Sequence, residues 1–126
     1  MSKKYGIGNW TQSQFVTAVR SGLNPKGRHY FPAFPYNSYA NMTDRDVVDL
    51  WSFWMTLPES GKDNIQHEIM WTLYSQRNVG IWKVLFQNQN WISDNVTRGT
   101  NLVEALGHCA ECHTPRNILG ALNTKK

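Results

Sequence analysis

The sequence has few cysteines, no long apolar run and no cluster of basic residues, and each shortage excludes a class of protein. Only two of its 126 residues are cysteines, so a four-ligand zinc site would need histidines as well. No window approaches the roughly 18 unbroken apolar residues of a membrane-spanning helix. The 13 basic residues are scattered and form no run that could follow a phosphate backbone. We therefore expect a soluble chain without a membrane span and without nucleic acid as a partner.

The N-terminus also lacks the apolar segment of a secretory leader, because Gly6, Gly8 and Asn9 interrupt any such run. The chain is therefore expected to be cytosolic or to have a leader outside this sequence. Its 126 residues favour a single domain with a real core. Aromatic residues are plentiful: six tryptophans, five tyrosines and five phenylalanines suit either a small core or the walls of a site for a large flat cofactor.

Capping residues and apolar periodicity predict an all-α chain. Thr11 and Gln14 form a capping box before a helix at about 11–21, and Thr43 caps a second helix that ends at Leu57-Pro58. Less regular patterns predict two helical stretches, within 65–73 and 81–86, with an interruption near 78–80. A further apolar stripe at 101–108 is expected to run directly into the cysteines.

Residues 22–41 are expected to form a long loop, because two glycines and three prolines forbid any long regular element there. We call this segment the aromatic loop. Structureless loops of this length in compact domains are usually functional. This one carries Tyr30, Phe31, Phe34, Tyr36 and Tyr39.

Both cysteines lie in the stretch Cys109-Ala110-Glu111-Cys112-His113, the cysteine motif. A redox dithiol would favour the start of a helix after a strand, whereas here the pair follows a helical stripe. Zinc would need further ligands from His29, His67, His108 or His113, and none has a finger-like spacing. Cys-x-x-Cys-His, however, is the attachment pattern of c-type haem.

The spacing of the cysteine motif suits haem chemistry. One helical turn brings two thiols to the two vinyl groups on one porphyrin edge and presents the next residue to the iron. Cys109 and Cys112 would then form thioethers with a covalent haem c, one per chain, and His113 would be the proximal ligand. A haem-free chain with a zinc-binding or redox dithiol site remains the alternative.

A methionine is a common second axial ligand, and Met42, Met55 and Met70 are the internal candidates. Met55 and Met70 lie in helical patterns, where ordinary core packing is the simpler interpretation. Met42 directly follows the aromatic loop and precedes a capped helix. We therefore favour Met42 as the second iron ligand.

Two segments resemble a known family: HYFPAFPYNSYANMTDRDVVDLWSFWMTLP at 29–58 and RGTNLVEALGHCAECHTPRNILGAL at 98–122, with a weaker match, RNVGIWKVLF, at 77–86. They are similar to the multihaem cytochrome c subunits of periplasmic membrane-bound alcohol, aldehyde and gluconate dehydrogenases. In that family the methionine that matches Met42 ligates iron, and Cys109, Cys112 and His113 match the attachment residues.

The order of these segments departs from a single haem domain, in which the attachment motif comes first. The resemblance therefore implies that residues 1–58 are the back half of one cytochrome c-like domain, 59–97 a helical connector and 98–126 the front half of the next. The halves are expected either to close on each other as a circularly permuted domain, with a helix at 99–113 crossing one at 43–56, or to pair between chains as a domain-swapped homodimer.

The resemblance also implies a function. The chain would be an electron carrier and not an enzyme, accepting single electrons from the catalytic subunit of a periplasmic dehydrogenase and passing them to a respiratory acceptor. Its location would then be the periplasm.

Overall fold

The computed structural model describes residues 2–4, 6–59, 61–62, 76–87 and 97–123. Within these ranges the chain is helical and has no β-strand, which confirms the predicted all-α class. No helix in these ranges is long and apolar enough to cross a membrane. The elements are α1 (Gln12–Ser21), α2 (Tyr36–Tyr39), α3 (Asp44–Thr56), α4 (Gln76–Phe86), α5 (Arg98–Asn101), the π-helix η2 (Leu102–Leu106) and α6 (Cys109–His113).

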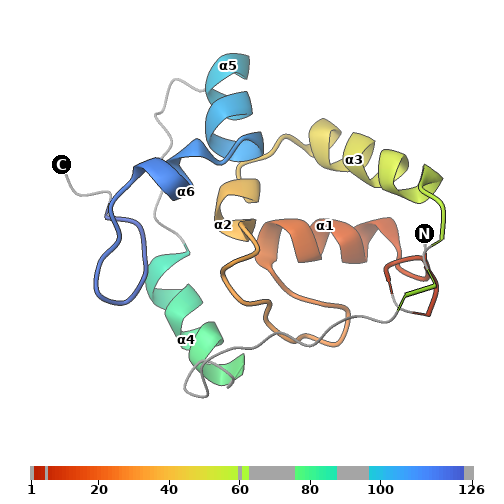
Figure 1. Ribbon diagram of the computed structural model, residues 1–126, viewed down its shortest axis with the longest axis horizontal. Coiled ribbons are helices and arrows are strands. Elements are labelled where there is room, and N and C mark those ends of the chain that lie inside the picture. The colour runs from red at the N-terminus through yellow and green to blue at the C-terminus, as the bar shows by residue number, and fades with distance from the viewer. Residues whose placement is uncertain (1, 5, 60, 63–75, 88–96, 124–126) are drawn as a thin grey trace.

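Helix α1 packs against both α2 and α3. Figure 1 shows α3 running back beside α1, with α2 near the C-terminal end of α1. The π-helix η2 packs against α2 and also contacts α6. The segment with the cysteines therefore lies beside the aromatic loop, although about 70 residues separate α2 from α6 in the sequence.

The predicted first helix is confirmed, together with its cap. The Thr11 side chain accepts a hydrogen bond from the Gln14 amide at 3.2 Å, and the Gln14 side chain accepts one from the Thr11 amide at 2.9 Å. Gly22 ends α1 in the left-handed conformation, with φ of 58°, and its amide donates to the Ala18 carbonyl. The helix buries Phe15, Ala18 and Val19.

The aromatic loop is more ordered than its proline content predicted. An antiparallel bridge joins Leu23 to His29, and α2 forms a single turn near the end of the loop. Tyr36, the first residue of α2, is fully buried, and its ring lies against Gly22. The short helix is compatible with the prolines because Pro35 precedes it and does not interrupt it.

Helix α3 begins after Thr43, as predicted, and the Thr43 hydroxyl accepts a hydrogen bond from the Asp46 amide at 3.2 Å. Its apolar stripe is only partly covered. Val47 is fully buried, whereas Trp54 and Met55 are each 39% exposed. The ring of Phe15 in α1 contacts Trp51 and Trp54, with centroids 5.2 and 5.9 Å apart.

The described core is small and joins segments from both ends of the chain. Its members come from α1, from α3, from the residue after the aromatic loop and from η2: Phe15, Val19, Met42, Val47 and Ala105. Leu50, Trp51 and Leu106 are among the side chains packed around it. The region that precedes the cysteine motif is thus part of the same core as the first helices.

Two helix boundaries predicted from the sequence were wrong. Helix α4 runs without interruption through Asn78 and Gly80, where a break was expected. A side chain at Gly80 would meet the His29 ring at 3.0 Å, so close packing explains this glycine better than a helix break does. The stretch predicted at 65–73 lies outside the described residues.

The helix predicted to run into the cysteines is also divided. The chain leaves η2 at Gly107, and His108 adopts a left-handed conformation with φ of 40°. Cys109 then begins α6, so the cysteines lie in a short helix of their own. Of these two segments η2 packs against α2, and Arg98 of α5 meets the first turn of α3 at Asp46.

Candidate functional site

The cysteine motif occupies the whole of α6, which begins at Cys109 and ends at His113. The two cysteines are not joined in a disulfide, and both are exposed. His113, the last residue of the helix, is exposed as well. One turn of helix therefore presents two thiols and an imidazole, the donor set that thioether attachment and axial ligation of a haem require.

His108 has a structural contact with the aromatic loop. Its ring meets the Tyr39 ring edge-on, with centroids 5.9 Å apart. The residue also forms the left-handed bend between η2 and α6. His108 thus connects the cysteine motif to α2.

A second contact joins α6 to α2 through Glu111. The Ser38 hydroxyl donates to the Glu111 carboxylate at 3.4 Å. The same carboxylate accepts a hydrogen bond from Arg116 at 2.6 Å, and Arg116 also donates to the Gly120 carbonyl at 2.8 Å. Arg116 is therefore paired both with α6 and with its own loop.

Met42 lies between these contacts and the core. The residue is 4% exposed, and its neighbours in the core cluster include Ala105 of η2. Its amide donates to the Tyr39 carbonyl at 3.0 Å, and its carbonyl accepts a hydrogen bond from Arg20 at 2.5 Å. Met42 thus lies beside the segment that leads into the cysteine motif, as ligation of a shared haem requires, but its sulfur is packed in the core.

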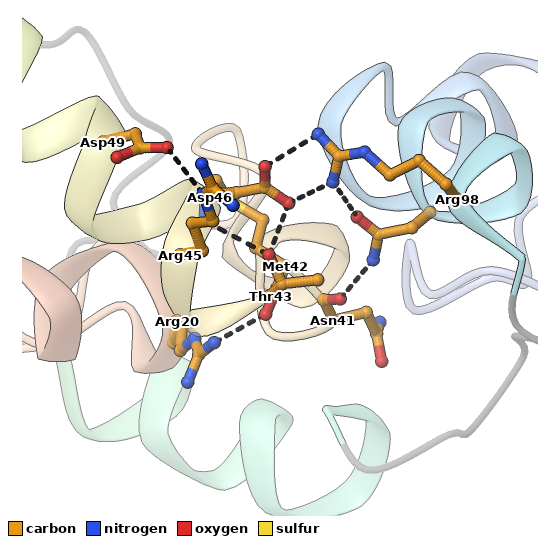
Figure 2. Close-up of polar contacts among 9 residues, drawn as sticks. Arg20, Asn41, Met42, Thr43, Arg45, Asp46, Asp49 and Arg98 are labelled. Atoms are coloured by element: carbon orange, nitrogen blue, oxygen red, sulfur yellow. Dashed lines mark hydrogen bonds and ion pairs between the residues drawn. The ribbon is translucent and has the colours of Figure 1, made fainter.

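The polar contacts around Met42 also join α5 to α3 (Figure 2). Arg98 forms two hydrogen bonds with the Asp46 carboxylate, at 2.5 and 2.8 Å. Asn101 donates to the Asn41 carbonyl at 2.7 Å. The hydrogen bonds from Arg98 and Thr43 lower the pKa of Asp46 to about 2, so this carboxylate stays ionised through the neutral range.

The cysteine motif fits a haem, whereas Met42 could ligate the iron of that haem only after its side chain had moved. Large apolar side chains are exposed before and after α6: Leu102, Val103, Ile118 and Leu119. A porphyrin bound at α6 is flat and apolar enough to cover such side chains. Ligation by Met42 additionally requires its sulfur to turn out of the core, which its flexible side chain permits.

The structure gives no support to the alternative of a zinc site. Among the described residues, no three histidine, cysteine, aspartate or glutamate side chains lie close enough together to hold a metal ion. A structural zinc site needs four such ligands. The candidates His67 and Met70 lie outside the described residues.

Sequence reasoning missed two features near His29. An open cavity of 540 Å³ is lined by Gly27, His29, Arg77, Gly80, Ile81 and Val84. Burial and the charge of Lys83 lower the pKa of His29. Lys83 is itself buried and donates to the carbonyls of Ser21 and Gly22, at the C-terminal end of α1. No local pattern signals these contacts, because the residues lie more than 50 positions apart.

Known proteins match the chain over most of its length, although no family model does. The diheme cytochrome c-type protein of Cereibacter sphaeroides is 43% identical over 121 residues, which cover 92% of this chain and 41% of that protein. The fructose dehydrogenase cytochrome subunit of Gluconobacter japonicus is 36% identical, over 97% of this chain and 27% of the subunit. The gluconate 2-dehydrogenase cytochrome c subunit of Pantoea cypripedii is 35% identical, over 92% and 28%.

These matches include both parts of the candidate site. A match over 92% of 126 residues leaves out only about ten residues, so it contains both Met42 and Cys109–His113. The chain spans less than half the length of each of these three relatives. The resemblance seen in the sequence is thus confirmed: over almost its whole length, the chain is homologous to part of the cytochrome c subunits of dehydrogenases.

Proposed function

We propose that this chain is part of a c-type cytochrome and carries single electrons through a haem c held by Cys109, Cys112 and His113. The observation that carries the proposal is the cysteine motif on α6, with two free exposed thiols and an exposed imidazole within one helical turn. The names of its relatives support it, because they describe a diheme cytochrome c-type protein and the cytochrome subunits of two dehydrogenases.

Each residue of the motif has a separate role. Cys109 and Cys112 would each hold the haem through a thioether: as each thiol adds to one vinyl group, its S–H bond would break and a C–S and a C–H bond would form. His113, next to Cys112, offers a nitrogen to the iron. The bound haem supplies the one-electron Fe(III)/Fe(II) couple, and the protein's part is to hold, cover and tune it.

Met42 is proposed as the second axial ligand. Support comes from its place beside η2 and from the contacts that join its loop to α6. A thioether is a neutral, soft donor and favours Fe(II), so the reduction potential should exceed that of a bis-histidine site.

The domain assignment is part of the proposal. Residues 1–58 and 98–126 are proposed as halves of two successive haem domains, joined by residues 59–97. The relatives match these segments in the same order, and one of them is a diheme cytochrome. The contacts of Asp46 with Arg98 and of Asn41 with Asn101 favour closure of the two halves within one chain.

The proposed electron path starts at the catalytic subunit of a periplasmic dehydrogenase and ends at a respiratory acceptor. Relatives named as cytochrome subunits of fructose and gluconate dehydrogenases support a dehydrogenase as the donor. The 13 basic residues outnumber the 9 acidic ones, and the resulting net charge of +4 would favour docking to an acidic partner surface.

Acid-acetone extraction after export with a cytochrome maturation system tests the function. The wild-type chain should keep a red colour and a sharp reduced absorption band after extraction, because thioethers survive this treatment. The double variant C109S/C112S should lose both. Extractable or absent haem in the wild-type chain would contradict the proposal and favour a haem-free dithiol.

A further inference from the structure

We infer that Glu111 is a positioning residue that anchors α6 from its buried side and so fixes the direction in which the cysteine motif faces the haem. The inference rests on the proposed attachment of haem to this motif and is independent of Met42. It assigns a role to a residue inside the motif that neither forms a thioether nor ligates iron.

The residues of α6 divide into two sides. Successive residues of an α-helix are turned by about 100° around its axis, so Cys109, Cys112 and His113 fall within an arc of about 100°. Glu111 lies on the other side, about 160° from Cys109 and from His113. Burial agrees with this division, because the two cysteines and His113 are exposed, whereas the Glu111 side chain is only 13% exposed. Glu111 therefore meets the protein while the motif faces away from it.

One partner of Glu111 lies in the loop that follows α6. Arg116 donates a hydrogen bond to the Glu111 carboxylate at 2.6 Å and another to the Glu111 carbonyl at 3.1 Å. The same guanidinium donates to the Gly120 carbonyl at 2.8 Å, and an antiparallel bridge joins Arg116 to Leu122. Hydrogen bonds between charged groups are stronger than neutral ones, and more so where water is largely excluded. The C-terminal half of α6 is thus tied to a closed loop.

The same carboxylate also meets α2. Ser38, which is fully buried, donates its hydroxyl to Glu111 at 3.4 Å. Burial and the nearby charge of Glu111 raise the pKa of Tyr36, the first residue of α2, to about 12. A single side chain therefore holds α6 between α2 and the loop that contains Arg116.

Without this anchor, α6 would keep its cysteines but lose its fixed direction. The bend at His108 and its contact with Tyr39 would still hold the N-terminal end of the helix. The C-terminal end, which carries His113, would be free to turn. Axial ligation depends on the orientation of the imidazole, whereas thioether formation requires only that the thiols reach the vinyl groups. Loss of Glu111 should therefore disturb ligation more than attachment.

The experiment compares Glu111→Gln with Glu104→Gln in the exported chain. Each removes one carboxylate charge close to the motif, but Glu104 lies on η2, and its Oε2 has no hydrogen-bond partner within the described part of the chain. Glu111→Ala also removes the acceptor, and Arg116→Gln removes the charged donor. The double variant E111A/R116Q tests whether the two residues act as one unit.

Three readouts separate anchoring, ligation and attachment. Hydrogen exchange at the Thr114 amide, which donates to the Ala110 carbonyl, measures how often the end of α6 opens. Loss of one charge-assisted hydrogen bond should speed this exchange about tenfold. Electron paramagnetic resonance of the ferric haem reports the orientation of its axial ligands, and the mass of the denatured chain reports covalent haem.

We expect E111A and R116Q to keep covalent haem, to exchange the Thr114 amide about tenfold faster, and to show several low-spin species where the wild type shows one. E111Q should lie between E111A and wild type, E104Q should match wild type, and E111A/R116Q should be no worse than E111A.

The failure of the inference differs from that of the proposed function. A wild type without covalent haem would contradict the function, and the positioning role would fail with it. Covalent haem together with an unchanged resonance in E111A would overturn the inference alone and leave the function standing. Equal effects of E104Q and E111Q would also overturn it, since the lost charge alone would then explain the change.

Discussion

At the scale of single residues, the two histidines around the cysteines have different surroundings. His113 ends α6 and is exposed, whereas His108 lies in a left-handed bend and packs against Tyr39. Both histidines lie next to the cysteine pair in the sequence. Only the position of His113 directly after Cys112 favours it as the iron ligand. The structure adds that the His108 ring is already engaged by the aromatic loop.

We therefore expect His113→Ala to lose the low-spin haem spectrum and His108→Ala to keep it. The reason is that only His113 follows the second attachment cysteine on the same helix. Absorption spectra of the ferric and ferrous proteins check this directly. A low-spin spectrum that survives H113A but not H108A would show that the proximal ligand is wrongly assigned.

Asp46 predicts a change of stability with pH. Hydrogen bonds from Arg98 and Thr43 lower its pKa to about 2, whereas an unfolded chain would hold it near 3.8. Its ionised form therefore stabilises the fold above about pH 4, and this contribution is lost as the pH falls from about 4 to about 2. The difference in free energy of unfolding between wild type and Asp46→Asn should be largest near neutral pH. It should shrink toward zero as the pH falls from about 4 to about 2.

Urea unfolding at a series of pH values measures that difference, with Asp49→Asn as the control. Asp49 is exposed and lies 3.7 Å from Arg45, so its loss should change stability little at any pH. A D46N difference that persists unchanged at pH 2 would mean that the Arg98–Asp46 contact does not carry the stability assigned to it.

At the scale of elements, the junction between α1 and α2 depends on a glycine. Gly22 and Gly27 both have positive φ, 58° and 72°. A side chain at Gly22 would meet the Tyr36 ring at 2.4 Å, whereas nothing lies within 4 Å of the same position at Gly27. The two glycines thus form a matched pair that differs in packing alone.

Gly27→Ala should cost about 1–2 kcal/mol, the strain of a left-handed alanine. Gly22→Ala should cost about 3 kcal/mol or more, because it adds a clash with a buried ring. Chemical denaturation of both variants gives the comparison. Equal losses would indicate that Tyr36 moves aside freely and that the α1–α2 packing is loose.

The elements that could be predicted from sequence are those fixed by neighbouring residues. Helices α1 and α3 have side-chain caps within three residues of the groups they satisfy, so Thr11, Gln14 and Thr43 identified both. The cysteine motif was recognisable for the same reason, since all its donors lie within five residues.

The features that sequence reasoning missed depend on distant partners. Gly80 was interpreted as a helix break, but it lies inside α4 against the His29 ring, and that contact is about 50 residues distant in the sequence. The bend at His108 requires a left-handed conformation that non-glycine residues rarely adopt. The hydrogen bond from Asn101 to Asn41 joins residues 60 positions apart, so no local pattern predicts it.

At the scale of the whole molecule, the proposal predicts how the halves pair. Residues 36–46 contact residues 98–111 within one chain through the Arg98–Asp46, Asn101–Asn41 and Ser38–Glu111 contacts. Pairing within one chain predicts a monomer whose iron–methionine band does not change on dilution. Analytical ultracentrifugation with spectra at several concentrations tests this, and a band found only in a dimer would instead indicate domain swapping.

The central claim is that Cys109 and Cys112 hold one haem covalently, and the mass of the intact chain tests it most directly. The wild-type chain exported with a cytochrome maturation system should gain the mass of one haem under denaturing conditions, and C109S/C112S should gain none. A wild-type chain without that gain, from cells that mature another c-type cytochrome in parallel, would contradict the claim.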